Sequence, residues 1–172
     1  MNDTPSPQDA PARLARLENR LTRRNRVETA VGAIVIMLLV WTGVRALSHA
    51  EAGAALLAGV GHLAAAAGVA FAVIWLLLRE ARNRRRSDEA PDAQAALRQR
   101  LIDESRLLGS AGGWYVLPLV PGFGLILAGA VVNGASIPAA LIGAGTGAAI
   151  LAFIWWLNDR AATEFDRRAR QA

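Results

Sequence analysis

Four long apolar blocks constrain this chain more than any other feature of its sequence. Arginine-bearing polar segments separate them, and they lie at residues 29–44, 52–78, 112–132 and 137–157. A helix of about 20 apolar residues, rising ~1.5 Å per residue, crosses the ~30 Å hydrocarbon core of a bilayer. The last three blocks are long enough, and the first is long enough if it includes Val27 and Glu28 and if Arg45 extends its charge to the interface. The sequence therefore predicts an all-α membrane protein with four transmembrane helices.

The basic residues predict how these helices are oriented. All 19 are arginine, and 18 of them lie before the first block, between the second and third, or after the fourth. Cytoplasmic flanks of membrane proteins are enriched in basic residues, so we expect both termini and the central segment to be cytoplasmic. Aromatic residues gather at the same ends of the blocks, as in an interfacial belt: Trp75, Trp114, Tyr115, Trp155 and Trp156.

Composition also bounds the location and the function. The chain is rich in alanine and glycine and has no lysine, which is typical of a GC-rich bacterial genome, so we expect a multi-pass protein of a bacterial inner membrane. A 26-residue polar leader and the interrupting Arg45 favour an uncleaved first span over a signal peptide. The sequence pI is about 11.3, but the three polar segments carry only about +2, +2 and +1. We therefore expect no nucleic-acid partner.

Catalytic and metal chemistry is not indicated. The chain has no cysteine, which excludes disulfides, thiolate nucleophiles and cysteine-ligated metals. It also lacks H-E-x-x-H, G-x-S-x-G and paired aspartates within the spans. We predict that the protein is not an enzyme and has no catalytic residue, cofactor or metal site.

The order of polar and apolar segments predicts two transmembrane hairpins, each preceded by a cytosolic amphipathic helix. The expected segments are a tail and amphipathic helix at 1–28, the first hairpin at 29–78, an Arg-rich linker and helix at 79–111, the second hairpin at 112–157, and a tail at 158–172. Similar Trp-ended spans in the two hairpins leave a duplication open.

Leucines at helical spacing identify the amphipathic helices. In the first, Leu14, Leu17 and Leu21 form a short stripe, typical of a helix that lies on the membrane surface or continues into the first span; a coiled-coil contact is the alternative. Asp92 is expected to cap the second, which carries Leu97, Leu101 and Leu108. Within that helix the neighbouring Asp103 and Glu104 point about 100° apart, so we interpret them as a solvated face rather than as an acid–base pair.

Turn signals join the spans within each hairpin. Ser48 and Glu51 form an S-x-x-E capping box before the second span. Asn133-Gly134 predicts the second turn, followed by Ser136 as a cap and Pro138 in the first helical turn.

Several residues are candidates for specific roles in the membrane. Arg82, Arg84, Arg85 and Arg86 follow the second span directly and are expected to anchor it to anionic lipid headgroups. The possible intramembrane polar site consists of His62 and Thr146, although a single interhelical hydrogen bond, or a position near the outer interface, is the simpler interpretation of His62.

The sequence GAGTG within the fourth span is a packing motif rather than a nucleotide loop. No strand precedes it, and it lies inside a helix of membrane-spanning length. As G-x-x-x-G, Gly143 and Gly147 lie on one face and allow another helix to approach.

Two prolines interrupt the third span at its cytoplasmic side. Starting this helix at Pro118 leaves 15 residues, about 22 Å, which is too short to cross the membrane, so Pro118 and Pro121 are expected inside the span. They should bend it, because each removes an N–H and its ring crowds the preceding turn.

From Ala95 onward the chain resembles a group of uncharacterised small bacterial inner-membrane proteins. The shared pattern is an amphipathic helix leading into W-Y-x-L-P-x-x-P-G and then a span with a charged tail, and here it falls on Trp114, Tyr115, Leu117, Pro118, Pro121 and Gly122. The resemblance implies cytosolic termini and brings no activity. We expect a scaffold, regulatory or accessory subunit with a cytosolic protein partner or a homo-oligomer; a small oligomeric transporter or channel is the alternative.

Overall fold

The fold is all-helical throughout the residues that the computed structural model describes, which are 9–49 and 53–171. The α-helices are α1 (Ala10–Ser48), α2 (Gly53–Asp88), α3 (Ala93–Gly109), α4 (Val120–Val132) and α5 (Ile137–Arg170). A π-helical turn (Gly112–Val116) and a 3-10 turn (Leu117–Leu119) connect α3 to α4. Four helical stretches are long and apolar enough to cross a membrane: α1, α2, Gly112–Val132 and α5. This confirms the prediction of four helices with the length and composition of membrane spans.

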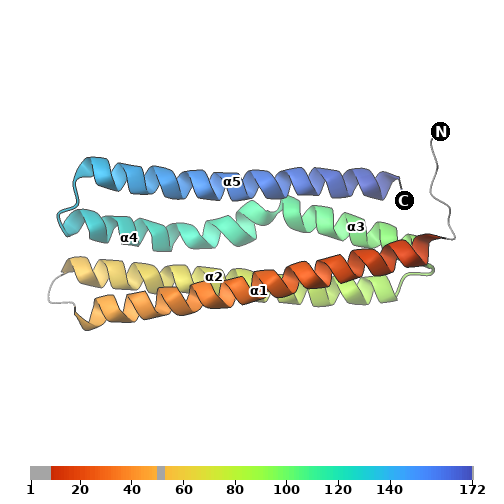
Figure 1. Cartoon of the computed structure of the whole chain (residues 1–172), viewed down its shortest axis with the longest axis horizontal. Helices are drawn as coiled ribbons and strands as arrows, with labels where there is room; N and C mark the ends of the chain where they lie inside the picture. Colours follow the sequence, from red (N-terminus) through yellow and green to blue (C-terminus); the bar gives the residue numbers. More distant parts are fainter. Residues whose placement is uncertain (1–8, 50–52, 172) are drawn as a thin grey trace.

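Three of these helices are longer than a membrane is thick. With 39, 36 and 34 residues, α1, α2 and α5 extend ~58, ~54 and ~51 Å, against ~30 Å of hydrocarbon. We define the polar half as residues 9–28, 79–109 and 158–171, and the apolar half as residues 29–49, 53–78 and 110–157. In Figure 1 the start of α1, the end of α5 and the α2–α3 turn lie at one end of the molecule, and the α4–α5 turn lies at the other.

The N-terminal leucine stripe belongs to a helix that does not stop at the span. Residues 10–28 and the first span form the single helix α1, which agrees with a continuous helix rather than a separate one on the membrane surface. No proline or glycine lies between Pro11 and Gly32 to break it. The expected boundary at residue 28 is therefore a change of composition within one helix.

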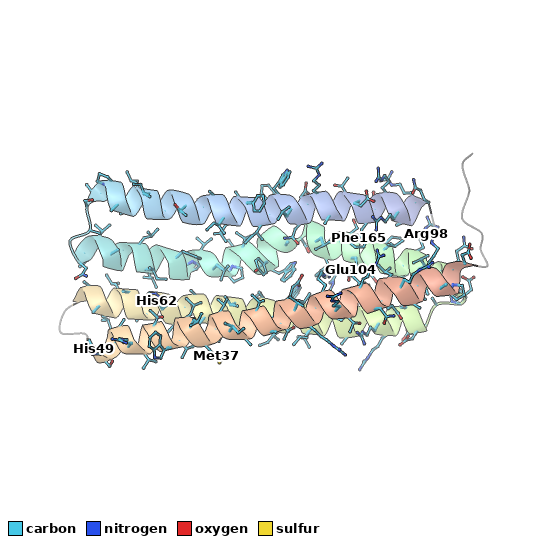
Figure 2. All side chains as sticks on the ribbon, viewed as in Figure 1. Met37, His49, His62, Arg98, Glu104 and Phe165 are labelled. Carbon is cyan, nitrogen blue, oxygen red and sulfur yellow. The ribbon has the colours of Figure 1, made fainter. Side chains whose placement is uncertain are left out.

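The polar half has an apolar core of its own. Leu97 and Leu101 of α3 are buried with Ala169 of α5, and Leu14, Leu17, Ile102 and Phe165 pack around them. The expected cap is confirmed, because Asp92 Oδ1 accepts the Ala95 N–H at 2.8 Å. Figure 2 shows Phe165 and Glu104 in this half of the molecule. The polar half is thus a packed helical bundle and not a set of loose tails.

In the apolar half the helices form a row, in the order α1, α2, α4, α5 (Figure 1). The closest approach is between α2 and α4. A Cβ added to Gly122 would lie 2.4 Å from the Ala65 nitrogen, and one added to Gly129 would lie 2.8 Å from the Ala58 nitrogen. An added methyl group would therefore collide with the backbone of the other helix, so both helices need small residues at this contact.

One face of α2 supplies those small residues. They recur at alternating spacings of four and three: Ala54, Ala58, Gly61, Ala65, Gly68 and Ala72. A Cβ added to Gly68 would lie 2.5 Å from the Pro118 carbonyl oxygen. This face therefore accommodates both α4 and the proline-bearing turn before it.

Gly143 and Gly147, the predicted packing pair, lie at the contact between α5 and α4, which is looser than the contact between α2 and α4. A Cβ added to Gly143 would lie 3.6 Å from Leu127, and one added to Gly147 would lie 3.8 Å from Phe123. Both are ordinary contact distances to side chains. Within this chain, the approach of α5 to α4 does not depend on these two glycines.

The two prolines lie in an irregular helical segment that contains a π-helical turn and a 3-10 turn. The Leu117 N–H donates to the Gly112 carbonyl, which is a π-helical bond, and the Val120 N–H donates to the Leu117 carbonyl. That carbonyl is the one that Pro121 leaves without its usual donor. The ribbon changes course between α3 and α4 in Figure 1. The Leu117 carbonyl, which Pro121 would otherwise leave unpaired, thus accepts a hydrogen bond from the Val120 backbone N–H.

The second predicted turn is confirmed residue by residue. Gly134 has φ +87°, and the Ser136 side chain accepts the Ala139 N–H at 3.4 Å, with a proline in the first turn of α5. At the first turn, Ser48 ends α1 and its hydroxyl donates to the Arg45 carbonyl at 3.0 Å. Glu51, the other member of the expected capping box, lies outside the described residues.

Candidate functional site: a buried ionic network in the polar half

Arg100 is the central charged group of the polar half. It lies on α3 with 1% of its surface exposed, and its Nη2 donates to Glu80 Oε1 of α2 at 2.5 Å. Arg84, one turn along α2, donates to the same oxygen at 2.9 Å. A buried guanidinium needs an ionised partner, because moving an isolated charge out of water costs several kcal/mol.

Glu104 extends the network from α3 to α1. Its side chain is completely buried, and Oε2 accepts from Arg24 Nη2 at 2.8 Å. Arg24 also lies 3.4 Å from Glu28 on its own helix. One half-exposed arginine thus joins α1 to α3 at the border between the two halves.

Asp103 forms the third connection, between α3 and the end of α2. It is 1% exposed; Gln99 donates to Oδ2 at 3.2 Å, and Arg86 Nη1 lies 3.5 Å from Oδ1. The expectation that Asp103 and Glu104 form a solvated face is therefore wrong. Both acids are enclosed because α1 and α2 extend beyond the span and pack against α3.

The network has more buried polar atoms than protein partners for them. Unpartnered atoms include both polar atoms of Asn83, Glu80 Oε2, Glu104 Oε1, and Arg100 Nε and Nη1. Leaving such groups without hydrogen bonds costs free energy, and a site with several donors and acceptors close together suits bound water. We expect ordered water molecules between α1, α2 and α3.

The carboxyl of Glu80 is held in its ionised form. Burial raises its pKa, but the hydrogen bonds from Arg100 and Arg84 outweigh burial, so the pKa of Glu80 lies below its usual range. The Arg100–Glu80 contact is therefore a charged pair at neutral pH.

The ion pairs of this network hold α1 and α2 against α3. The network brings together side chains of α1, α2 and α3 that are up to 80 residues apart in the sequence. A one-turn slip of α3 would separate Arg100 from Glu80, so we interpret the network as the contact that fixes the register of the polar half. Among the described residues, no group of three or more His, Cys, Asp or Glu side chains is placed to hold a metal ion.

The arginines expected to anchor the second span divide into two pairs. Arg84 and Arg86 contact the buried acids, and Arg84 also donates to Thr22 of α1 at 2.8 Å. Arg82 and Arg85 are exposed. The first pair is thus part of the network, and the second pair lies on the surface outside it.

His62 and Thr146 are not brought together. His62 Nδ1 lies 2.7 Å from the Ala58 carbonyl, one turn back on α2, and Thr146 is exposed on α5. α4 lies between these two helices (Figure 1). Within the described ranges, the interhelical hydrogen bond expected for His62 is therefore not formed, and its hydrogen bond is made within α2 instead.

Sequence reasoning missed the network, and the available signal was weak. Glu80, Asn83 and Ser87 are buried on one face of α2 at helical spacing, but a polar face normally indicates exposure to solvent. The small-residue face of α2 was also missed, although its regular spacing is visible in the sequence.

Comparisons with protein-family models, with curated proteins and with solved structures found no match for this chain. The resemblance of its second half to small bacterial inner-membrane proteins stays a prediction.

Proposed function

We propose that the chain is a non-catalytic integral protein of a bacterial inner membrane that acts as a scaffold, regulator or accessory subunit. Its termini and α2–α3 turn would be cytoplasmic, and the two hairpins of the prediction would correspond to α1–α2 and α4–α5. The asymmetric arginine distribution supports this orientation. Arg82 and Arg85 would lie beside anionic headgroups.

One observation carries the proposed role: the polar half is a packed bundle that continues beyond three of the spans. Its core and its ionic network hold α1, α2, α3 and α5 together, whereas spans alone need no such extension. A rigid, arginine-rich bundle next to the membrane offers a partner a defined surface. His62 and Thr146 do not line a common path, so no specific observation favours the transporter or channel alternative.

Site-specific photocrosslinking in cells tests this role. A crosslinking residue at position 98 or 160, both exposed in the polar half, is expected to give one adduct of defined mass, either with a partner protein or with a second copy. The control position is 137, where the isoleucine is 70% exposed at the far end of the apolar half. No discrete adduct from either polar position, or the same adduct from all three, would contradict the role.

A further inference from the structure

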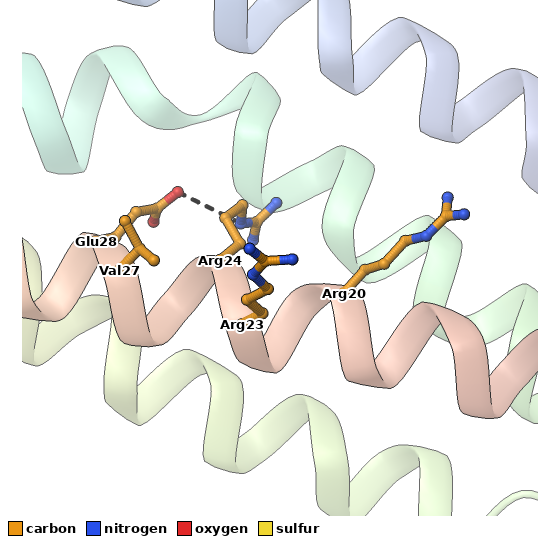
Figure 3. Close-up of a pocket in the computed structure, with 5 residues that line it drawn as sticks. All are labelled: Arg20, Arg23, Arg24, Val27 and Glu28. Atoms are coloured by element: carbon orange, nitrogen blue, oxygen red, sulfur yellow. Dashed lines mark ion pairs between the residues drawn. The ribbon is translucent and has the colours of Figure 1, made fainter.

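An exposed pair of arginines lies at the border between the two halves. Arg20 and Arg23 are exposed on α1 and line a shallow, open groove with Arg24, Val27 and Glu28 of the same helix. Figure 3 shows the three arginine side chains on this stretch of α1, with Arg24 directed to Glu28. Among the residues that the structure describes, neither Arg20 nor Arg23 forms an ion pair, so both guanidinium groups are available to an anion.

An apolar stripe begins where the arginines end. Val27, Val31, Ile34 and Leu38 continue along α1 at spacings of three and four, and each is more than 50% exposed. From Val27 to Leu38 the stripe is ~16 Å long, close to the ~15 Å thickness of one leaflet of hydrocarbon. The groove and the stripe together have the polarity of a phospholipid: an anion-binding end followed by an acyl-chain surface.

We propose that this face of α1 binds an anionic phospholipid, with the phosphate between Arg20 and Arg23 and an acyl chain along Val27, Val31 and Ile34. Arg24 already forms ion pairs with Glu104 and Glu28. Its positive charge therefore offsets the negative charge of Glu28 at the end of the groove. Arginine suits the role because its planar donor fork matches phosphate oxygens. The lipid site does not depend on the protein partner proposed above.

Native mass spectrometry of the detergent-purified protein tests the site with phosphatidylglycerol and phosphatidylcholine of identical acyl chains. The wild-type protein is expected to prefer phosphatidylglycerol, and Arg20→Gln/Arg23→Gln is expected to lose about tenfold of that preference. The matched control is Arg16→Gln/Arg98→Gln, which removes two exposed charges farther from the apolar half and should keep the preference. Because all four side chains are exposed, each variant should retain the helical content and elution volume of the wild type.

Three results would overturn the proposal. One is an unchanged preference in Arg20→Gln/Arg23→Gln, and another is an equal loss in the control, which would show general electrostatic attraction. The third comes from a competition in which millimolar inorganic phosphate displaces bound phosphatidylglycerol. That displacement would mean that the arginines bind phosphate alone and that the apolar stripe contributes nothing.

Discussion

Replacing Arg100 by methionine is expected to destabilise the protein by about 3–5 kcal/mol, because it leaves the buried Glu80 carboxylate without its main partner. The pair is 2.5 Å apart, and Glu80 Oε2 already has no protein partner. Arg84 is half-exposed and can compensate only part of the lost charge. The free energy of unfolding in detergent, measured by denaturant titration, gives the difference.

The control for this substitution lies two residues away. Arg98 is exposed on the same helix, so Arg98→Met should change the free energy of unfolding by less than about 0.5 kcal/mol. Adding Glu80→Met to Arg100→Met should restore most of the lost stability, since apolar pairs of similar volume often replace a buried ion pair without loss. Equal effects of Arg100→Met and Arg98→Met would show that the network contributes nothing to stability.

The second large effect is expected at Gly122, where a single methyl group should separate α2 from α4. An added Cβ would lie 2.4 Å from the Ala65 nitrogen and 2.7 Å from the Ala65 Cα, and neither helix backbone can yield without moving as a whole. Overpacking of this kind typically costs about 1–3 kcal/mol. We expect Gly122→Ala to lower the free energy of unfolding by at least that amount, measured by the same titration.

Gly124 provides the matched control on the same helix. An added Cβ there would have no neighbour within 4 Å, and alanine is favoured over glycine inside a helix by about 0.5–1 kcal/mol. Gly124→Ala should therefore be neutral or slightly stabilising. If the two alanine variants unfold alike, α2 and α4 do not approach as closely as the structure indicates.

The parts of the fold that sequence patterns predicted are those that local physics determines. Four stretches are long enough to span a bilayer, Asp92 and Ser136 cap their helices, and Gly134 makes its turn. The caps and the turn each follow from residues within one or two turns of one another, and each apolar stretch follows from one continuous run of sequence. The irregular turns at Pro118 and Pro121 also have a local cause, because the missing N–H groups are a property of those residues alone.

What the sequence did not reveal depends on pairs of distant residues. Asp103 and Glu104 are typical of an exposed helix face until Arg24, about 80 residues earlier, is placed beside Glu104. Gly143 and Gly147 carry a familiar packing pattern, yet the closest contact formed at Gly122 and Gly129, whose partners lie on α2. In both cases the helix that packs alongside determines whether a residue is buried or in close contact. Which helix that is cannot be inferred from the neighbouring residues in the sequence.

The central claim is that continuous helices cross a bilayer and hold a polar bundle on one side of it. Because the chain has no cysteine, single cysteines can be introduced at Glu89, Asn133 and Val31 and labelled with a membrane-impermeant maleimide. In intact cells only Asn133→Cys should react, and Glu89→Cys should react after lysis. Val31→Cys, at a position 53% exposed in the protein itself, should stay protected by lipid in both conditions. Labelling of Val31→Cys in lysed membranes, or of Glu89→Cys and Asn133→Cys from the same side, would contradict the account.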